Sequence, residues 1–237
     1  MKTTLPSGKA PHLDTARLYW VRPETFIETP AALALLTADE RAQHQRFIPP
    51  GKRREYLVAR VLARTVLGNA LNCAPESVHF TTNPWGRPEV EGLHFNLTHT
   101  DGLVTLLLSE HHEVGVDTEL LTRAPKLLEL GPNVFAPNEL KDLTALPADR
   151  RAQRAVTLWT LKESYIKARG MGLALALDGF AFRFTAEGLQ LEVEPGLNDD
   201  GARWQFQTLT FGPHLISTAI HHPPGDPVTL ELLEARL

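Results

Sequence analysis

The alternation of hydrophobic and polar positions predicts that the first half of the chain folds as a short helix, a long helix and then strands. The short helix begins at Thr37, and the segment Pro49-Pro50-Gly51 breaks the chain after it. The long helix covers 52–67 and is closed by Gly68. The expected strands of this half lie at 16–21, 78–82, 93–98, 103–108 and 113–120, with a hairpin turn at Asp101-Gly102.

The second half of the chain repeats this order of elements. A short helix begins at Ala136, Pro147 breaks the chain, and a long helix covers 149–169 and is closed by Gly170. The expected strands of this half lie at 180–184, 189–193, 204–209, 215–220 and 228–233.

Because the two halves match, the sequence predicts an α+β fold of two similar lobes related by pseudo-twofold symmetry. We expect a loose tail at 1–14, a first lobe within 1–109 and a second lobe within 110–237. A cleft between two lobes is a favoured place for a ligand, so we expect the functional site at the interface.

Residues 158–173 read as a helix followed by a glycine turn, and they carry the first sign of a site. On a helical wheel Lys162 falls in the middle of an apolar arc, with Glu163 on its rim and Lys167 one turn further along. A lysine in an apolar stripe is unfavourable unless an anion meets it. Either Lys162 extends to solvent beside an exposed Glu163–Lys167 pair, or this helix lines a site that holds both an anion and a cation.

Composition narrows the class of protein. The 237 residues are 43% hydrophobic and 22% charged with a net charge of −4, which argues against a nucleic-acid partner and leaves local phosphate binding open. The single cysteine, Cys73, excludes an internal disulfide and a cysteine metal cluster. The N-terminus lacks the apolar core of a signal peptide, and no run approaches the roughly 20 apolar residues of a membrane span. We therefore expect a cytoplasmic protein with no membrane partner.

Asp117 and Glu119 are the first candidates for chemistry. Side chains at i and i+2 of a strand project to one face, so Val114 and Val116 would point the other way, into the core. Two neighbouring carboxylates repel unless water or a metal ion screens them, and such oxygen ligands suit Mg²⁺. A solvated strand face explains the pair equally well, although Glu163 as a third carboxylate favours the metal.

Histidine and arginine side chains could bind an anion. His99 stands at the end of a predicted strand, where polar groups reach a ligand, although a lone histidine is more often structural. Arg87 lies in a tight turn at 83–88. Basic residues also gather on the first long helix, where a solvated face is the default interpretation and a phosphate site is the alternative. They are Lys52, Arg53, Arg54, Arg60 and Arg64.

Three common catalytic signatures are missing from the sequence. Gly51-Lys52 is not a phosphate-binding P-loop, because Arg46 stands where the first glycine is required. Gly170-Met171-Gly172 does not extend to a dinucleotide-binding fingerprint. No Gly-x-Ser-x-Gly occurs, so the nucleophile elbow of the serine hydrolases is also absent.

Three motifs together resemble the 4′-phosphopantetheinyl transferases, specifically the larger pseudo-dimeric, surfactin-synthetase-activating class found with secondary-metabolite synthases. The family pattern is Phe-Asn-Leu/Ile-Ser-His-Ser, then Gly-Ile/Val-Asp-Ile-Glu, then Trp-x-x-Lys-Glu-x-x-x-Lys with a glycine turn. The matching segments here are Phe95-Asn-Leu-Thr-His-Thr, Gly115-Val-Asp-Thr-Glu and Trp159-Thr-Leu-Lys-Glu-Ser-Tyr-Ile-Lys. Each motif alone is weak, but all three in this order are specific.

The resemblance implies an enzyme that transfers the phosphopantetheine arm of coenzyme A to a serine of an apo acyl, peptidyl or aryl carrier protein. The implied cofactor is Mg²⁺, and the implied by-product is adenosine 3′,5′-bisphosphate. Asp117, Glu119 and Glu163 would hold the Mg²⁺, and Glu163 would also be the base for the carrier serine, directly or through water. Two lobes in one chain supply a complete site, so a monomer is expected.

The same resemblance implies further site residues. Lys167 and His99 would act beside Glu163 in catalysis, and Glu139 matches an acidic position near the metal site. The implied contacts to the phosphates and the adenosine end of coenzyme A come from Arg54, Arg87, Thr98, His99, Lys162 and Lys167.

The chain departs from the family pattern at several positions. Threonines replace the serines on both sides of His99, which keeps the hydroxyl groups and adds a methyl. The short first helix lacks the lysines that family members can carry there, which shifts 3′-phosphate binding to Arg41 or to Arg53 and Arg54. Glu55 stands at or beside a position that is usually basic.

Two other functions stay open on the sequence. One is a non-catalytic relative that binds coenzyme A or a carrier protein and keeps the fold. The other is a different Mg²⁺-dependent phosphohydrolase, which would use the same carboxylates without a carrier protein. The intact acidic and lysine positions argue against the non-catalytic relative.

Overall fold

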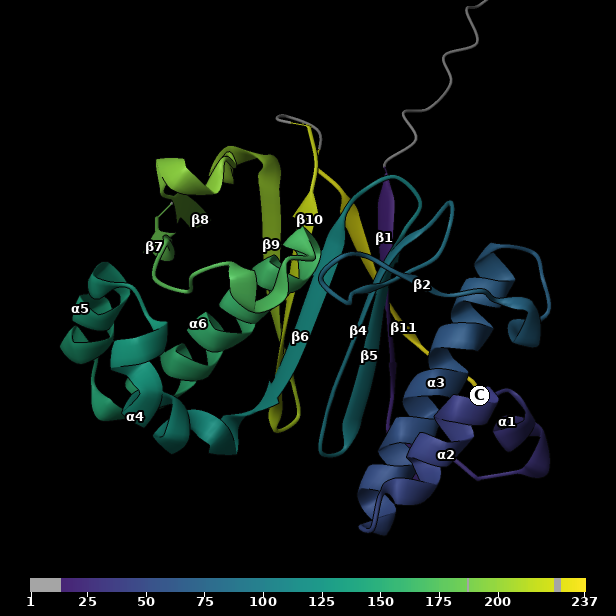
Figure 1. Ribbon diagram of the computed structural model, residues 1–237. Coiled ribbons are helices and arrows are strands. Elements are labelled where there is room, and N and C mark those ends of the chain that lie inside the picture. Colours follow the sequence, from purple (N-terminus) through teal and green to yellow (C-terminus); the bar gives the residue numbers. More distant parts are fainter. Residues whose placement is uncertain (1–13, 187, 224–226) are drawn as a thin grey trace, which may run out of the picture.

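The computed structural model describes residues 14–186, 188–223 and 227–237, and it contains two α+β lobes of the same plan, as the sequence predicts (Figure 1). The tail expected at 1–14 lies outside the described residues except for Asp14. Each lobe has one long helix, α3 (Pro50–Ala70) in the first and α6 (Ala148–Arg169) in the second. The shorter α-helices are α1 (Pro30–Ala34), α2 (Ala38–Arg46), α4 (Ala124–Val134) and α5 (Pro137–Ala145).

Two sheets form the centre of the molecule, between α3 on one side and α6 on the other (Figure 1). The first has the strand order β11-β1-β5-β4, and the second has the order β6-β10-β9. Their strands are β1 (Thr15–Val21), β4 (His94–Thr100), β5 (Leu103–Ser109), β11 (Thr229–Glu234), β6 (Val114–Leu120), β9 (Trp204–Phe211) and β10 (His214–His221). Two small hairpins pair β2 (Thr81–Thr82) with β3 (Pro88–Glu89) and β7 (Phe180–Thr185) with β8 (Gly188–Val193).

The last strand of the chain returns to the first lobe. β11 runs parallel to β1, with Thr229 opposite Thr15, although 110–237 was expected to form the second lobe. The alternation of side chains along a strand is the same whichever sheet the strand joins, so the sequence pattern could not show this pairing. A division of the chain at 109/110 therefore describes the lobes only up to β10.

Each long helix is buried along one face, and a glycine has a different role near the C-terminal end of each. α6 ends at Gly170, whose φ of 64° is the left-handed conformation that closes a helix, as predicted. The prediction that Gly68 closes the first long helix is wrong, because α3 continues to Ala70. A Cβ on Gly68 would stand 3.0 Å from the Cys73 carbonyl oxygen, so this glycine permits close packing instead. None of the helices in the described part of the chain is long and apolar enough to cross a membrane.

The structure confirms one local prediction, a hairpin turn, and contradicts another, a short strand. The hairpin at Asp101-Gly102 is confirmed: Thr100 pairs with Leu103, and Gly102 has a φ of 82°. The strand expected at 78–82 is wrong over most of its length, because only Thr81–Thr82 is extended and paired. A 3₁₀ turn at Pro75–Ser77 precedes it, and its proline at the first position is preorganised for a helical turn.

Candidate active site

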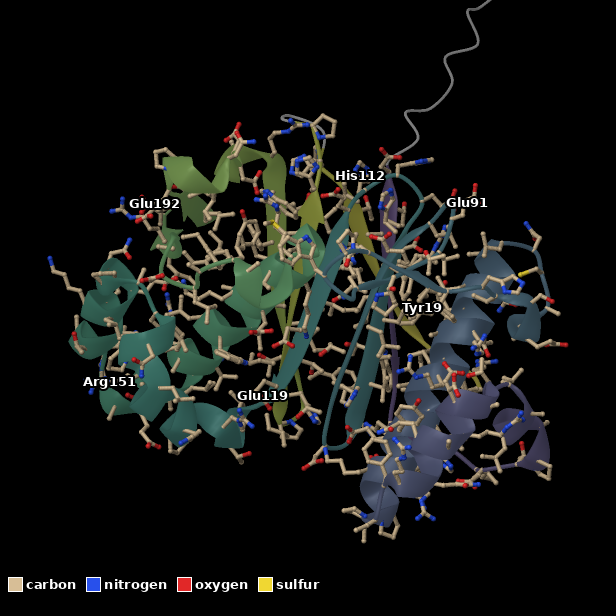
Figure 2. All side chains as sticks on the ribbon, viewed as in Figure 1. Tyr19, Glu91, His112, Glu119, Arg151 and Glu192 are labelled. Carbon is tan, nitrogen blue, oxygen red and sulfur yellow. The ribbon has the colours of Figure 1, made fainter. Side chains whose placement is uncertain are left out.

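β6 presents its two carboxylates on one face and its valines on the other. Val114 and Val116 are fully buried in an apolar cluster between the sheets, with Ile216 among their neighbours. Asp117 and Glu119 project to the opposite face, toward the cleft, as the i, i+2 spacing predicts. Glu119 lies near the end of β6, between the lobes (Figure 2).

Helix α6 crosses that face of β6 at Gly115. A Cβ on Gly115 would stand 2.5 Å from the Ala168 backbone nitrogen, so the missing side chain is what allows the helix to approach the strand. Glu163 and Lys167, one helical turn apart, are carried by this approach toward Asp117. The glycine of the Gly-x-Asp-x-Glu segment is therefore part of the site's construction, a role that sequence reasoning missed.

Lys167 joins the two lobes through a short hydrogen-bonded cluster. Its Nζ donates to Asp117 Oδ1 at 2.5 Å and to Thr98 Oγ1 at 3.0 Å. The Thr98 hydroxyl in turn donates to Asp117 Oδ1 at 3.2 Å. Thr98 belongs to β4, Asp117 to β6 and Lys167 to α6, so the cluster brings together residues from all three sequence motifs.

Asn96, from the first motif, makes a second link between the lobes. Its side-chain oxygen accepts a hydrogen bond from the Val116 backbone nitrogen at 2.9 Å. This bond holds β4 against β6, which belong to different sheets. The asparagine of the Phe-Asn-Leu segment is thus explained by strand alignment, which the sequence alone did not indicate.

Asp117 and Glu163 have too few cationic neighbours to neutralise both carboxylates. Burial raises the pKa of Asp117, and the neighbouring Lys167 ammonium only partly opposes that effect. Burial also raises the pKa of Glu163, and the Asp117 charge raises it further, whereas Lys167 acts in the opposite direction. One ammonium group therefore serves two carboxylates, of which Asp117 is buried and Glu163 half-buried, and this arrangement favours a further cation.

Glu119 is held in place by neighbours from both lobes. Its Oε1 accepts hydrogen bonds from the Thr100 hydroxyl at 3.2 Å and from the Leu120 backbone nitrogen at 2.9 Å. Arg123 Nε lies 3.6 Å from its other oxygen, and the Glu119 side chain is only 13% exposed. These contacts fix the orientation of this carboxylate beside the cleft.

Three cavities run in series along the cleft. The first, of about 490 Å³, is lined by Glu163, Lys167, Arg87 and Trp85 together with apolar residues of 166–177. The second, of about 330 Å³, shares Lys167 with the first and is also lined by Thr98 and His99. The third, of about 500 Å³, shares His99 with the second and is bordered by Glu119. Lys167 and His99 therefore stand at the two junctions of one extended groove.

The positions of two residues do not support the roles that the sequence predicted for them. Lys162 is fully buried, and its Nζ lies 2.9 Å from Glu139 Oε2 and 2.7 Å from the carbonyl oxygens of Leu177 and Phe180. The expectation that Lys162 meets phosphate is therefore wrong, because its ammonium group faces protein acceptors on every side. Glu139 is likewise fully buried and accepts hydrogen bonds from two backbone nitrogens, so its contacts do not support a part in holding a metal ion.

Two arginines also lie differently from expectation. Arg87 lines the first cavity, but its guanidinium donates to the backbone carbonyl oxygens of Ala168, Phe95 and Val114, so it ties the lobes together. Arg54 is exposed and lines a separate hollow on the first lobe rather than any of the three cleft cavities. A contact from Arg54 to a ligand in the cleft is therefore not supported.

The residues that could hold a metal ion are the three predicted carboxylates. In the part of the chain that the structure describes, no three histidine, cysteine, aspartate or glutamate side chains surround a common point as metal ligands do. The donor chemistry still fits Mg²⁺, which usually takes one or two protein carboxylates and completes its shell with water and phosphate oxygens. Glu163 in particular lines the first cavity without a hydrogen bond or ion pair to any described residue.

Comparison with known proteins identifies the family. Residues 113–219 match the family model described as the 4′-phosphopantetheinyl transferase superfamily. The chain is 32% identical over 164 residues to a Synechocystis sp. protein assigned as a 4′-phosphopantetheinyl transferase, covering 67% of each chain. It is 28% identical over 183 residues to a 4′-phosphopantetheinyl transferase of Bacillus subtilis, covering 76% of this chain and 80% of the relative.

A solved structure shows a partial likeness. A holo-(acyl-carrier-protein) synthase from Bacillus anthracis, solved in complex with coenzyme A (3′,5′-ADP), is 18% identical with a TM-score of 0.40. The match covers 46% of this chain and 94% of that chain. The assignment to a family accordingly depends on the sequence relatives.

The chain belongs to the 4′-phosphopantetheinyl transferase superfamily. It is an enzyme that transfers the 4′-phosphopantetheine arm of coenzyme A to carrier proteins, as its three motifs predict. The α+β fold in two lobes agrees with this membership.

Proposed function

We propose that the extended groove between the lobes is the transferase site and that it binds coenzyme A across Lys167 and His99. The observation that carries this proposal is the unpartnered Glu163 carboxylate, which lines the first cavity beside Lys167 and within electrostatic reach of Asp117. A carboxylate in this position could bind a metal ion on one side and accept a proton from a substrate on the other.

Each polar residue of the groove has a proposed role in the reaction. Lys167 Nζ, already bonded to Asp117 and Thr98, would donate to a phosphate oxygen of the pyrophosphate. Thr98 and His99 would bind the phosphates toward the adenosine end. Because phosphoryl transfer depends mainly on positioning and charge neutralisation, these contacts supply what the protein must contribute.

Glu163 would accept the proton of the carrier serine, directly or through water. The serine oxygen bonds to the phosphorus that carries the pantetheine arm, and the bond from that phosphorus to the bridging oxygen breaks. The bridging oxygen leaves with adenosine 3′,5′-bisphosphate. Glu163 lines the first cavity without a hydrogen bond or ion pair to any described residue, so its carboxylate is available to accept this proton.

Mg²⁺ would be held by Asp117, Glu119 and Glu163. When bound, it would neutralise charge on the pyrophosphate as the leaving group departs. The shortage of positive charge around these carboxylates supports this assignment, because one ammonium group serves Asp117 and Glu163 together.

One assay distinguishes this function from the two alternatives. The protein is incubated with coenzyme A, Mg²⁺ and an apo acyl or peptidyl carrier protein, and the carrier is then weighed by mass spectrometry. One phosphopantetheine arm on a single serine is the expected result. Cleaved coenzyme A without a carrier adduct would indicate a phosphohydrolase, and neither product would indicate a binding protein.

We also propose that the enzyme acts as a monomer in the cytoplasm, without a nucleic-acid or membrane partner. The proposed site draws on β4, β6 and α6 of one chain, which supports a monomer. The net charge of −4 supports the absence of a nucleic-acid partner. A single species of 26.3 kDa in light scattering would be the expected result for the oligomeric state.

A further inference from the structure

Glu55 is a buried carboxylate that faces the half-exposed imidazole of His99. Glu55 belongs to α3 and is only 3% exposed, whereas the His99 side chain on β4 is 46% exposed. His99 Nδ1 and Glu55 Oε1 form a hydrogen bond. A carboxylate can only accept, so the shared proton is on the imidazole side whenever Glu55 is ionised.

Lys52 and Asp101 extend this contact into a charged network. Lys52 Nζ lies 3.2 Å from Glu55 Oε2 and 2.6 Å from Asp101 Oδ1. Burial disfavours the charged form of Glu55, but the hydrogen bond from His99 and the nearby Lys52 outweigh it and hold the pKa of Glu55 below its usual value. Glu55 is therefore an anion at neutral pH, fixed from two sides.

With Nδ1 bonded to Glu55, the nitrogen that His99 has left for a ligand is Nε2. The imidazole lines the second and third cavities, and Arg60 and Lys167 line the second cavity with it. A neutral imidazole that gives its only proton to Glu55 would present a lone pair at Nε2, which repels an anion. A protonated imidazole donates from both nitrogens, and an adjacent carboxylate favours that form.

We propose that Glu55 is a positioning residue that holds His99 as an imidazolium, so that Nε2–H donates to a phosphate group in the second cavity. This inference rests on the proposed function, in which His99 contacts a phosphate of coenzyme A. Glu55 itself touches no substrate. It acts through His99 by accepting the Nδ1 proton and by supplying the charge that keeps the second proton in place.

Other charged groups also lie around His99. The cationic groups oppose a positive imidazole, and the anionic groups favour it. Those on the elements packed around His99 are Lys52, Glu55 and Arg60 from α3, Asp101 from the β4–β5 turn, Glu119 from β6, Arg123 after it, and Lys167 from α6. Among them Glu55 is hydrogen-bonded directly to the ring.

A double-mutant cycle tests whether Glu55 acts through His99. Glu55→Gln, His99→Ala and the double variant are compared with the wild-type enzyme in the carrier-protein assay. Glu55→Gln is expected to raise the KM for coenzyme A about tenfold, because a charge-assisted hydrogen bond is lost. The kcat should change less than about twofold. In the His99→Ala background the same substitution should change KM less than about twofold.

Glu129→Gln is the matched control, because Glu129 is exposed on α4 and, among the described residues, pairs with Lys126 alone. Melting temperatures are measured for every variant. An equal effect of Glu55→Gln in both backgrounds would overturn the inference, since the residue would then act on the fold and not through His99. A wild-type enzyme that leaves the carrier unmodified would instead overturn the proposed function.

A measurement on the wild-type enzyme covers the case in which Glu55→Gln does not fold. The ¹⁵N chemical shifts of the imidazole nitrogens are recorded with bound coenzyme A at pH 7, and the His99→Ala spectrum assigns the His99 signals. Both nitrogens of His99 are expected to carry protons. A neutral ring, with either nitrogen bare, would contradict the inference.

Discussion

Gly115 of β6 packs against Ala168 of α6 so closely that a Cβ on the glycine would stand 2.5 Å from the Ala168 backbone nitrogen and closer still to the Ser164 carbonyl oxygen. Both neighbours are backbone atoms, which cannot rotate away as a flexible side chain could. The contact fixes how near α6 lies to β6. It therefore sets the distance from Glu163 and Lys167 on α6 to Asp117, which lies on the same face of β6 as Gly115.

Gly115→Ala should disable the site through this contact. The added methyl must push α6 away from β6, and overpacking of this kind typically lowers the free energy of unfolding by about 1–3 kcal/mol. Because displacement of catalytic groups by about 1 Å can lower a rate about 100-fold, transfer activity should fall further than stability alone explains. Urea denaturation and the carrier-protein assay measure the two effects.

Gly51→Ala is the control for that substitution. Gly51 lies in the first turn of α3, and a Cβ there would meet no atom within 4 Å. Alanine is the better helix former, so this variant should gain about 0.5–1 kcal/mol or remain unchanged, with full activity. If both alanine variants behaved alike, the close contact at Gly115 would not be the determinant of the site.

The local pattern of the chain predicted most of its elements. The hydrophobic pattern identified β4, β5 and β6, and the Asp101-Gly102 turn gave the hairpin between the first two. α4 was missed, since it contains Pro132, which interrupts the pattern from which a helix is inferred. The parallel pairing of β11 with β1 was also missed, because the choice of sheet depends on contacts far apart in the sequence.

The sequence could predict the positions of site residues whose side chains share one face of the same strand or helix. The i, i+2 spacing placed Asp117 and Glu119 correctly on the cleft side of β6. Helical spacing could not tell whether the charge of Lys162 would meet a ligand or a buried carboxylate. That outcome was decided by Glu139 on a different helix, which sequence periodicity does not position.

Lys162→Met should destabilise the fold and leave coenzyme A binding intact. The substitution leaves the Glu139 carboxylate buried without its cation, and breaking a buried pair on one side typically costs about 3–5 kcal/mol. Because Lys162 faces protein acceptors, the KM for coenzyme A should stay within about twofold at a temperature where the variant is folded. A large rise in KM with unchanged stability would restore the role in phosphate binding.

Asp199 should make the fold sensitive to acid. Burial disfavours its charged form, but hydrogen bonds from Tyr165, Arg169 and Trp204 outweigh that and hold its pKa below the usual value. A carboxyl with a lowered folded-state pKa contributes stability that is present above its unfolded pKa and is lost as the pH falls through the folded pKa.

The measurement that isolates this contribution is the melting temperature of wild-type protein and Asp199→Asn between pH 7 and pH 3. The wild type should melt higher at pH 7, and the difference should shrink below about pH 4, where the unfolded carboxyl begins to bind a proton. A difference that stays constant over this range would mean that shape, and not charge, accounts for the effect of Asp199.

Asp117→Ala should lower turnover far more than it lowers affinity for coenzyme A. If Asp117, Glu119 and Glu163 hold Mg²⁺, losing one ligand removes stabilisation that matters most as the leaving group departs, and kcat should fall about 100-fold. The Mg²⁺ concentration that gives half-maximal thermal stabilisation of the coenzyme A complex should rise in the same variant.

Asp142→Ala, a change at an exposed position of α5, is the control and should match the wild type in both measurements. Chelation of divalent ions with EDTA should stop the wild-type reaction. Turnover by Asp117→Ala that equals the wild type at saturating Mg²⁺ would refute the metal-binding role of this carboxylate, which lies against Lys167.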